Sequence, residues 1–376
     1  MSFASDFDSF TARLRRFFRA ACSESMPIEQ DLKSDADFRV SCENDFNSLA
    51  LELFGLQFKY NEPYRKFCEG RGLVPQMVEH WAEIPTLPTA AFKECELSCL
   101  PLAQRTAVFH SSGTTEHRPS RHFHNSESLA IYEESLWTWF LQKQKADAPK
   151  QNLLILTPPP NEAPHSSLVH MFETIRQKLG PAQVAYAGQV DHMGSWVLDS
   201  EMAIRFLSEI KNGNQAVLVL GTAFSYVHLL DTLAERGVRF ELPAGSQTME
   251  TGGYKGRSRE LPKAQLHELI TFRLGIQRSH ILCEYGMSEL GSQAYEWCIE
   301  QIFRFPPWAR VQVVSPETGQ EVAEGETGVI RVFDLANVFS VTAVQTEDLG
   351  VRRANGFELV GRATLAEARG CSLMPA

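Results

Sequence analysis

The feature that most limits the fold is an alternation of helical and strand patterns between residues 127 and 285. The segments NLLILTPPP (152–160), QVAYAG (183–188) and AVLVLGT (216–222) are short and apolar, which predicts buried strands. Segments with apolar residues at three- and four-residue spacing, which is typical of helices, lie between them. Because such alternation is typical of parallel strands covered by helices, we predict an α/β fold.

The regions on either side have a different character. The first hundred residues have mainly helical spacing, and the sequence after Trp308 is β-rich, with a hairpin signal at Ala354-Asn355-Gly356. No linker separates independent domains, so we predict one domain over 1–362 followed by a flexible tail. The expected parts are a helical N-terminal part (1–105), an α/β nucleotide-binding part (106–307), a β-rich subdomain (308–362) and the tail with Cys371 (363–376).

Charge and hydropathy narrow the possible partners. The 376 residues carry a formal net charge of −10, which disfavours nucleic acid and anionic membranes. The apolar run from Ala216 to Phe224 is too short to span a bilayer, and Asp6 and Asp8 are unlike a signal peptide. We therefore expect a cytoplasmic protein with no membrane span and no nucleic acid partner.

The eight cysteines are scattered. Cys95 and Cys99 have four-residue spacing, but no second Cys/His pair accompanies them at zinc-site spacing. We interpret most of the cysteines as small buried hydrophobes. Cys371 is the exception, because it stands close to the end of the sequence, where nothing nearby would bury it.

A hydroxyl-rich loop, VFHSSGTTEHRPSRH (108–122), is the strongest local signal. Its hydroxyls, the free N–H groups around Gly113 and the nearby Arg118 and Arg121 suit a phosphate group. The ending of a Walker A loop is absent. An ordinary Ser/Thr-rich surface loop is the alternative.

A glycine pair follows another predicted strand in METGGYKGRSREL (249–261). Gly252 and Gly253 allow close backbone approach to a flat ligand, with Lys255 and Arg257 adjacent. A simple glycine turn is the alternative.

The segment ILCEYGMSELGSQAY (281–295) places polar groups after an apolar strand. Tyr285 can stack on a base, Ser288 can meet phosphate, and the Glu289 carboxylate can hold Mg²⁺. Its alternative is a polar strand-to-helix junction. Further on, Asp348 can accept from ribose hydroxyls and Arg362 can bind ribose or phosphate, unless both are hairpin residues.

Taken in order, these motifs resemble those of the adenylate-forming superfamily, which includes acyl-CoA synthetases and luciferases. The resemblance runs from Ile84 to Arg362 and implies an ATP site with Mg²⁺. It assigns the triphosphate to the hydroxyl loop, adenine to the Tyr-Gly motif, the metal to the glutamate, ribose to the aspartate and a hinge to the Gly-Arg pair. The implied ATP-binding residues are Ser111, Ser112, Gly113, Thr114, Thr115, Gly252, Gly253, Tyr285, Gly286, Ser288, Asp348 and Arg362, with Glu289 at the metal.

Two departures from that pattern matter. The phosphate loop usually continues Thr-Gly-x-Pro-Lys, whereas here Thr115 is followed by Glu116 and His117, so Arg118 or Arg121 would replace the lysine. The superfamily's usual C-terminal domain, with its catalytic lysine, is expected to be lacking. Lys255 and Arg257 are further candidates for the missing cation.

One short branch of the superfamily, the acyl-protein synthetases of the LuxE type, also ends close to a cysteine. The similarity implies a ligase that activates a fatty acid, passes it to Cys371 as a thioester and delivers it to an acyl-CoA-reductase-like partner. His165 and Ser166 are expected in the acyl pocket, although His165 can equally be a helix-start residue. The alternatives are a small acyl- or aryl-CoA ligase and a non-catalytic nucleotide-binding regulatory subunit.

Overall fold

The computed structural model describes residues 3–23, 32–111, 118–144, 151–253 and 259–362, with only the backbone given at 22–23 and 32–42. The α-helices are α1 Phe3–Ser23, α2 Leu32–Tyr60, α3 Glu62–Glu69, α4 Ala91–Glu94, α5 Ser126–Lys143, α6 Ser167–Leu179, α7 Ser200–Ile210, α8 Ala223–Glu235 and α9 Lys263–Leu274. The 3₁₀ turns are Pro75–Met77, Trp81–Glu83, Leu102–Gln104 and Arg278–His280. The strands are β1 Leu87–Pro88, β2 Ala107–His110, β3 Arg121–His124, β4 Asn152–Ile155, β5 Val184–Tyr186, β6 Gly188–Val190, β7 Trp196–Leu198, β8 Val217–Thr222, β9 Gln247–Thr251, β10 Ile281–Tyr285, β11 Ala294–Trp297, β12 Ala309–Val314, β13 Thr327–Asp334, β14 Ala343–Arg353 and β15 Gly356–Arg362.

The central sheet has six strands in the order β11-β10-β9-β8-β4-β5. From β10 to β5 all neighbours are parallel, and β11 alone runs antiparallel to β10. The helices that flank the strands of this sheet begin and end at residues suited to those places. Asn125 caps the start of α5, and Gly180 ends α6 in the left-handed conformation, with a φ of 55°.

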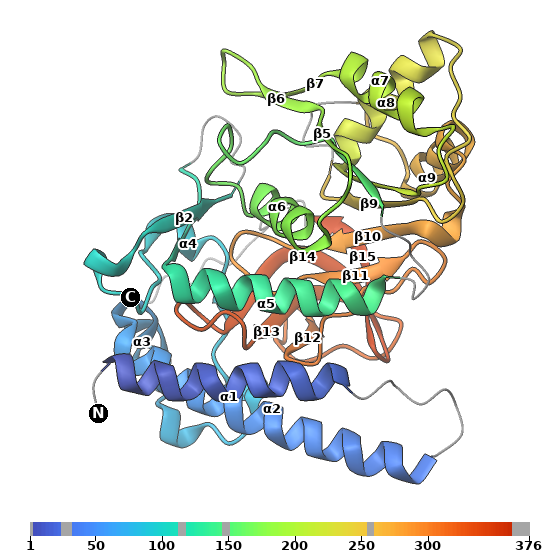
Figure 1. Cartoon of the computed structure of the whole chain (residues 1–376). Helices are drawn as coiled ribbons and strands as arrows, with labels where there is room; N and C mark the ends of the chain where they lie inside the picture. The colour runs from blue at the N-terminus through green and yellow to red at the C-terminus, as the bar shows by residue number, and fades with distance from the viewer. Residues whose placement is uncertain (1–2, 24–31, 112–117, 145–150, 254–258, 363–376) are drawn as a thin grey trace, which may run out of the picture.

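Helices cover both faces of this sheet. Leu153 and Ile155 of β4 pack with α5 and α6, whereas Leu154 and Leu156, on the opposite face, pack with α7 and α8. Figure 1 shows α5 and α6 on one side of the strands and α7 to α9 towards the other end of the molecule. We call these sides the α5–α6 face and the α7–α9 face.

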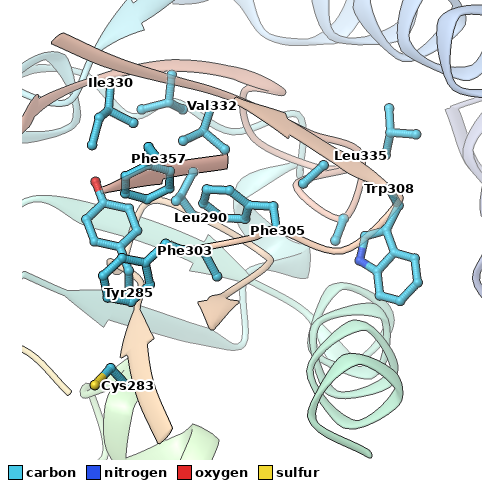
Figure 2. Close-up of a cluster of buried hydrophobic side chains, with 14 of the residues drawn as sticks. Cys283, Tyr285, Leu290, Phe303, Phe305, Trp308, Ile330, Val332, Leu335 and Phe357 are labelled. Carbon is cyan, nitrogen blue, oxygen red and sulfur yellow. The ribbon is translucent and has the colours of Figure 1, made fainter. Parts of the chain in front are cut away.

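A second sheet is built from β12, β13, β14 and β15, which pair in antiparallel fashion, with β1 added parallel to β14. Between the two sheets lies an aromatic cluster that includes Tyr285, Phe303, Phe305 and Phe357 (Figure 2). The Phe303 and Phe357 rings are stacked with centroids 5.5 Å apart. This packing fixes β14 and β15 beside the end of β10.

The N-terminal helices pack against the rest of the domain. Helix α1 contacts α2 and α5 (Figure 1), and Arg15 pairs with Glu127 and Glu134 of α5. The buried Gln57 amide donates to the carbonyl oxygens of Asn337 and Val338 at 2.9 and 3.0 Å. The N-terminal part therefore supports the loop that joins β13 to β14.

The α/β fold predicted from the alternating pattern is confirmed, and so is the turn of the predicted hairpin, which joins β14 to β15. The antiparallel strand β11 and the hairpins β2–β3 and β6–β7 were not predicted. Among the described residues, no helix combines the length and apolar character required to cross a bilayer.

Candidate functional site

The carboxyl ends of β9 and β10 meet at one edge of the central sheet. Cys283 and Glu284 of β10 align with Glu250 and Thr251 of β9, so the two following turns start side by side. Gly252 has a φ of +68°, a conformation that glycine adopts without steric cost, and an added Cβ there would meet no atom of the described residues within 4 Å. Within the described residues, no side chain or backbone atom therefore covers this side of Gly252.

Gly286 follows β10 for a different reason. A Cβ at this position would lie 2.3 Å from Oε1 of Glu284, a buried carboxyl group two residues earlier. Glycine at this position leaves room for that carboxyl group. The chain then continues through Met287 into the turn that contains Ser288 and Glu289.

Ser288 and Glu289 are buried at the centre of a polar network. The Ser288 hydroxyl donates to Oε2 of Glu289 at 3.0 Å and lies 3.4 Å from the Ser120 hydroxyl. Nδ1 of His122 donates to the Ser288 carbonyl oxygen at 2.7 Å, while burial lowers the pKa of His122 to about 4. Asn337 donates to the Glu289 carbonyl oxygen at 2.8 Å. The β2–β3 hairpin and the central sheet thus meet at this serine.

Tyr285 connects the two sheets. Its hydroxyl donates to Oδ2 of Asp348 on β14 at 2.9 Å. Burial raises the pKa of Asp348, and the hydrogen bond from Tyr285 opposes that rise. The exposed Arg362 places Nε 3.9 Å from Oδ1 of Asp348. The Tyr285 ring is 7% exposed and packs against Phe357, with centroids 5.2 Å apart.

The structure describes only the ends of the hydroxyl-rich loop. The Ser111 hydroxyl accepts from the Ser120 N–H at 3.0 Å, which closes the base of the loop. Arg118 is exposed. Arg121 pairs with Glu96 at 3.2 Å, so its charge is already partly balanced. The predicted site residues Ser112, Gly113, Thr114, Thr115, Lys255 and Cys371, and the candidate Arg257, lie outside the described residues.

The two residues expected in the acyl pocket lie at the start of α6. His165 is exposed, and its Nδ1 donates to the Val108 carbonyl oxygen at 3.2 Å. The Ser166 hydroxyl accepts from the Val169 N–H at 3.3 Å and so caps the helix. These contacts join the segment before α6 to β2, and the acyl-pocket role stays a prediction.

The buried carboxyl groups that were not predicted from the sequence include Asp334 and Glu284. Asp334 accepts from the Gly291 N–H at 2.8 Å, the Ser292 hydroxyl at 2.7 Å and the Ala336 N–H at 3.0 Å, and so holds the turn after Glu289. Burial raises its pKa to about 6. Burial also raises the pKa of Glu284, to about 7, and the Thr251 hydroxyl donates to it. In both cases the sequence pattern that could have indicated them is an acidic residue within an apolar strand or at its end.

Comparisons with known proteins agree on the type of protein. The family model described as "Acyl-protein synthetase, LuxE" matches residues 28–375. The long-chain-fatty-acid–luciferin-component ligase of Aliivibrio fischeri is 23% identical over 340 residues, which cover 87% of this chain and 86% of that protein. The ligase of the same description from Vibrio harveyi is 23% identical over 335 residues, covering 84% of each chain.

Solved structures show the same fold. A 2-hydroxyisobutyryl-CoA ligase in an open conformation, in complex with 2-HIB-AMP and CoA, has a TM-score of 0.61. Its sequence is 13% identical, and the match covers 85% of this chain and 70% of that one. The same ligase in its thioesterification state has a TM-score of 0.59 and covers 89% of this chain. The fold is therefore that of the adenylate-forming enzymes.

Proposed function

The chain belongs to the LuxE family of acyl-protein synthetases, and on that premise we propose that it uses ATP and Mg²⁺ to activate a fatty acid and then acylates its own Cys371. In the first step a carboxylate oxygen of the acid attacks the α-phosphorus of ATP. An acyl-adenylate forms and pyrophosphate leaves. In the second step the Cys371 thiolate attacks the acyl carbon, the bond to the AMP oxygen breaks, and AMP leaves.

The observation that carries this proposal is the hydrogen bond from Tyr285 to Asp348. It brings a carboxylate of the second sheet to the carboxyl end of β10, the edge at which α/β sheets bind ligands. We assign the ribose hydroxyls to Asp348, with Arg362 beside it. Because the Tyr285 ring is enclosed by phenylalanines, its main contribution in this proposal is to hold Asp348 in place.

The phosphate end of ATP is assigned to the β2–β3 hairpin and the turn after β10. Ser120 contacts both Ser111 and Ser288. Its N–H donates to the Ser111 hydroxyl, and its own hydroxyl contacts the hydroxyl of Ser288. Glu289 offers the carboxylate oxygen that Mg²⁺ prefers as a ligand. Bound Mg²⁺ would offset charge on the triphosphate. Among the described residues, the candidates for the cation that assists adenylation are Arg118, which is exposed beside this hairpin, and Arg121, which pairs with Glu96.

The thioester on Cys371 is proposed as the form handed to an acyl-CoA-reductase-like partner. A thiolate is a strong nucleophile and also a good leaving group, so a thioester can form and be passed on without further activation. Cys95, an exposed cysteine, provides a matched comparison for the reactivity of Cys371.

The test uses the full chain with ATP, Mg²⁺ and radiolabelled acids from short to long chain length. Protein-bound label released by neutral hydroxylamine is scored for the wild type, Cys371→Ser and Cys95→Ser, together with pyrophosphate exchange. We expect label on the wild type and on Cys95→Ser, none on Cys371→Ser, and exchange in all three. Acyl-CoA formation by Cys371→Ser without protein labelling would identify a CoA ligase. Nucleotide binding without exchange would identify a non-catalytic subunit.

A further inference from the structure

A second group of reactive side chains is buried on the α7–α9 face of the central sheet, below the turns that form the candidate ATP site. Glu250 on β9 and Cys283 on β10 are cross-strand neighbours, and His267 of α9 lies over both. Their exposed fractions are 7%, 1% and 1%. Figure 2 shows Cys283 on the same strand as Tyr285. Nothing in the proposed adenylation or acyl transfer uses these three residues.

The distances in this cluster suit a tetrahedral metal ion. Nε2 of His267 lies 3.5 Å from Oε2 of Glu250 and 3.6 Å from Sγ of Cys283. One ligand atom from each residue lies within 4.8 Å of the other two. Zinc bonds of about 2.0–2.3 Å at tetrahedral angles separate neighbouring ligand atoms by about 3.3–3.6 Å. The two distances from Nε2 of His267 are therefore close to the spacing that an ion between these ligands requires.

Cys298 orients the imidazole. Its Sγ lies 3.0 Å from Nδ1 of His267, on the edge of the ring away from Glu250 and Cys283. With the hydrogen on Nδ1, the ring donates to Cys298 and presents the lone pair of Nε2 to the other two residues. Metal-bound histidines are commonly held by such a hydrogen bond from their second nitrogen. Cys298 is thus a positioning residue, outside the ligand set.

The charges around the cluster leave room for a cation. The neighbouring Lys263 pairs with Glu296, and Arg278 donates to Cys298. Glu250 and Cys283 have His267 as their polar partner within the cluster. Binding of a divalent ion would release the thiol proton of Cys283 and any proton on Nε2 of His267, so the charge of the ion would take the place of those protons inside the cluster.

We propose that Glu250, His267 and Cys283 bind a single divalent zinc-type ion in a site separate from the ATP site. The mixture of oxygen, nitrogen and thiolate sulfur favours zinc over Mg²⁺ or Ca²⁺, which prefer oxygen ligands alone. Because the ligands come from β9, β10 and α9, the ion ties this helix to the two strands. Glu250 directly precedes Thr251 and Gly252, so the ion also steadies the Thr-Gly-Gly turn. This proposal does not depend on the proposed function.

The test measures metal in the full chain purified without chelators. Elemental analysis should find about one zinc ion per chain in the wild type. After removal of the metal, Co²⁺ should restore a site with a thiolate-to-cobalt charge-transfer band. Absence of metal in the purified protein, together with no uptake of Zn²⁺ or Co²⁺ by the apoprotein, would overturn the proposal.

Variants locate the site. Cys283→Ser should lose the thiolate band, whereas Cys298→Ser should keep the band with about 10–100-fold weaker metal affinity. Cys99→Ser, which changes another buried cysteine, and Glu284→Gln, which changes the buried carboxyl of the opposite face, should bind metal as the wild type does. If Cys283→Ser fails to fold, the cobalt spectrum of the wild type still decides whether a thiolate is bound. A band that persists in folded Cys283→Ser would place the metal elsewhere and refute the site.

Discussion

The two faces of the β9–β10 pair carry different chemistry although their residues alternate along the same two strands. On the α7–α9 face, Glu250 lies beside an imidazole and a thiol. On the α5–α6 face, Glu284 accepts from the Thr251 hydroxyl and lies near the tyrosines Tyr132 and Tyr295. Burial favours a proton on Glu284, against the opposing effect of the hydrogen bond from Thr251. On the other face, the proposed ion would balance the charge of Glu250 instead, because an imidazole and a thiol stand beside that carboxyl group.

Removal of the proposed zinc ion should have the largest effect. A ligand present at about 1,000 times its dissociation constant stabilises the folded state by about 4 kcal/mol. We therefore expect chelation to lower the free energy of unfolding of the wild type by this order, as measured by urea denaturation with and without saturating Zn²⁺. Glu284→Gln should show the same difference, and Cys283→Ser should show none. If the wild type is equally stable with and without Zn²⁺, the α7–α9 face does not hold a stabilising ion and the two faces do not differ in this respect.

Glu284→Gln should change how stability depends on pH. The pKa of Glu284 is about 7 in the folded chain, against a usual value of 4.5, so the folded chain holds this proton more tightly than the unfolded chain. Its contribution is therefore fully present below pH 4.5 and is lost as the pH rises to about 7. The loss amounts to about 3 kcal/mol, and the glutamine variant should lack it.

Urea denaturation of the wild type and the variant at a series of pH values gives this difference directly. Glu324→Gln, which removes an exposed carboxyl group, is the matched control and should follow the wild type. If the difference between wild type and Glu284→Gln stays constant from pH 4.5 to 7, the carboxyl group of the α5–α6 face is neutralised by something other than a proton.

Tyr285→Phe tests whether the α7–α9 face also holds the nucleotide site together. The variant removes a hydrogen bond to the Asp348 carboxylate, which costs about 1.5–3 kcal/mol for a charged acceptor. The pKa of Asp348 should rise further, because the Tyr285 hydroxyl opposes the effect of burial. We expect weaker stability and a higher KM for ATP in pyrophosphate exchange.

The matched control is Tyr186→Phe, which removes another tyrosine-to-carboxylate hydrogen bond, to Glu173, at the far edge of the central sheet. It should lose stability but keep the KM for ATP. Parallel changes of KM in both variants would mean that the nucleotide site responds to general loosening of the sheet rather than to the link between Tyr285 and Asp348.

Arg362→Ala should have the smallest effect on stability. The side chain is 80% exposed and its Nε lies 3.9 Å from Asp348, so we expect a change below about 0.5 kcal/mol. Pyrophosphate exchange should nevertheless need more ATP, because the guanidinium is assigned to the nucleotide. A loss of stability as large as that of Tyr285→Phe would show that Arg362 supports the fold instead.

Local patterns made much of the fold predictable from sequence. The continuous apolar run AVLVLGT predicts a central parallel strand. It forms β8, in which every residue from Val217 to Thr222 is buried. The β2–β3 hairpin was missed because its second strand buries two histidines, His122 and His124, which an apolar pattern does not include. Strand β1 was missed because only its pairing with β14 makes two residues a strand.

The candidate site was predictable only as separate segments. Tyr285 and Asp348 were each singled out from their local sequence, but the hydrogen bond between them depends on how two sheets pack. The cluster of Glu250, His267 and Cys283 could not be recognised from spacing, because its members come from two strands and a helix. The interpretation of Cys283 as a small buried hydrophobe accounts for its burial but leaves out its polar neighbours.

The steric contact at Gly286 has a consequence for the evolution of such chains. A Cβ there would strike the carboxyl group of Glu284, so a larger residue at this position would require that carboxyl group to move. The two positions should therefore change together. Where a relative replaces the glutamate with a shorter side chain, selection against a larger residue after the tyrosine is relaxed. A glycine that looks like part of a ligand-binding motif would then be retained because of the buried carboxyl group beside it.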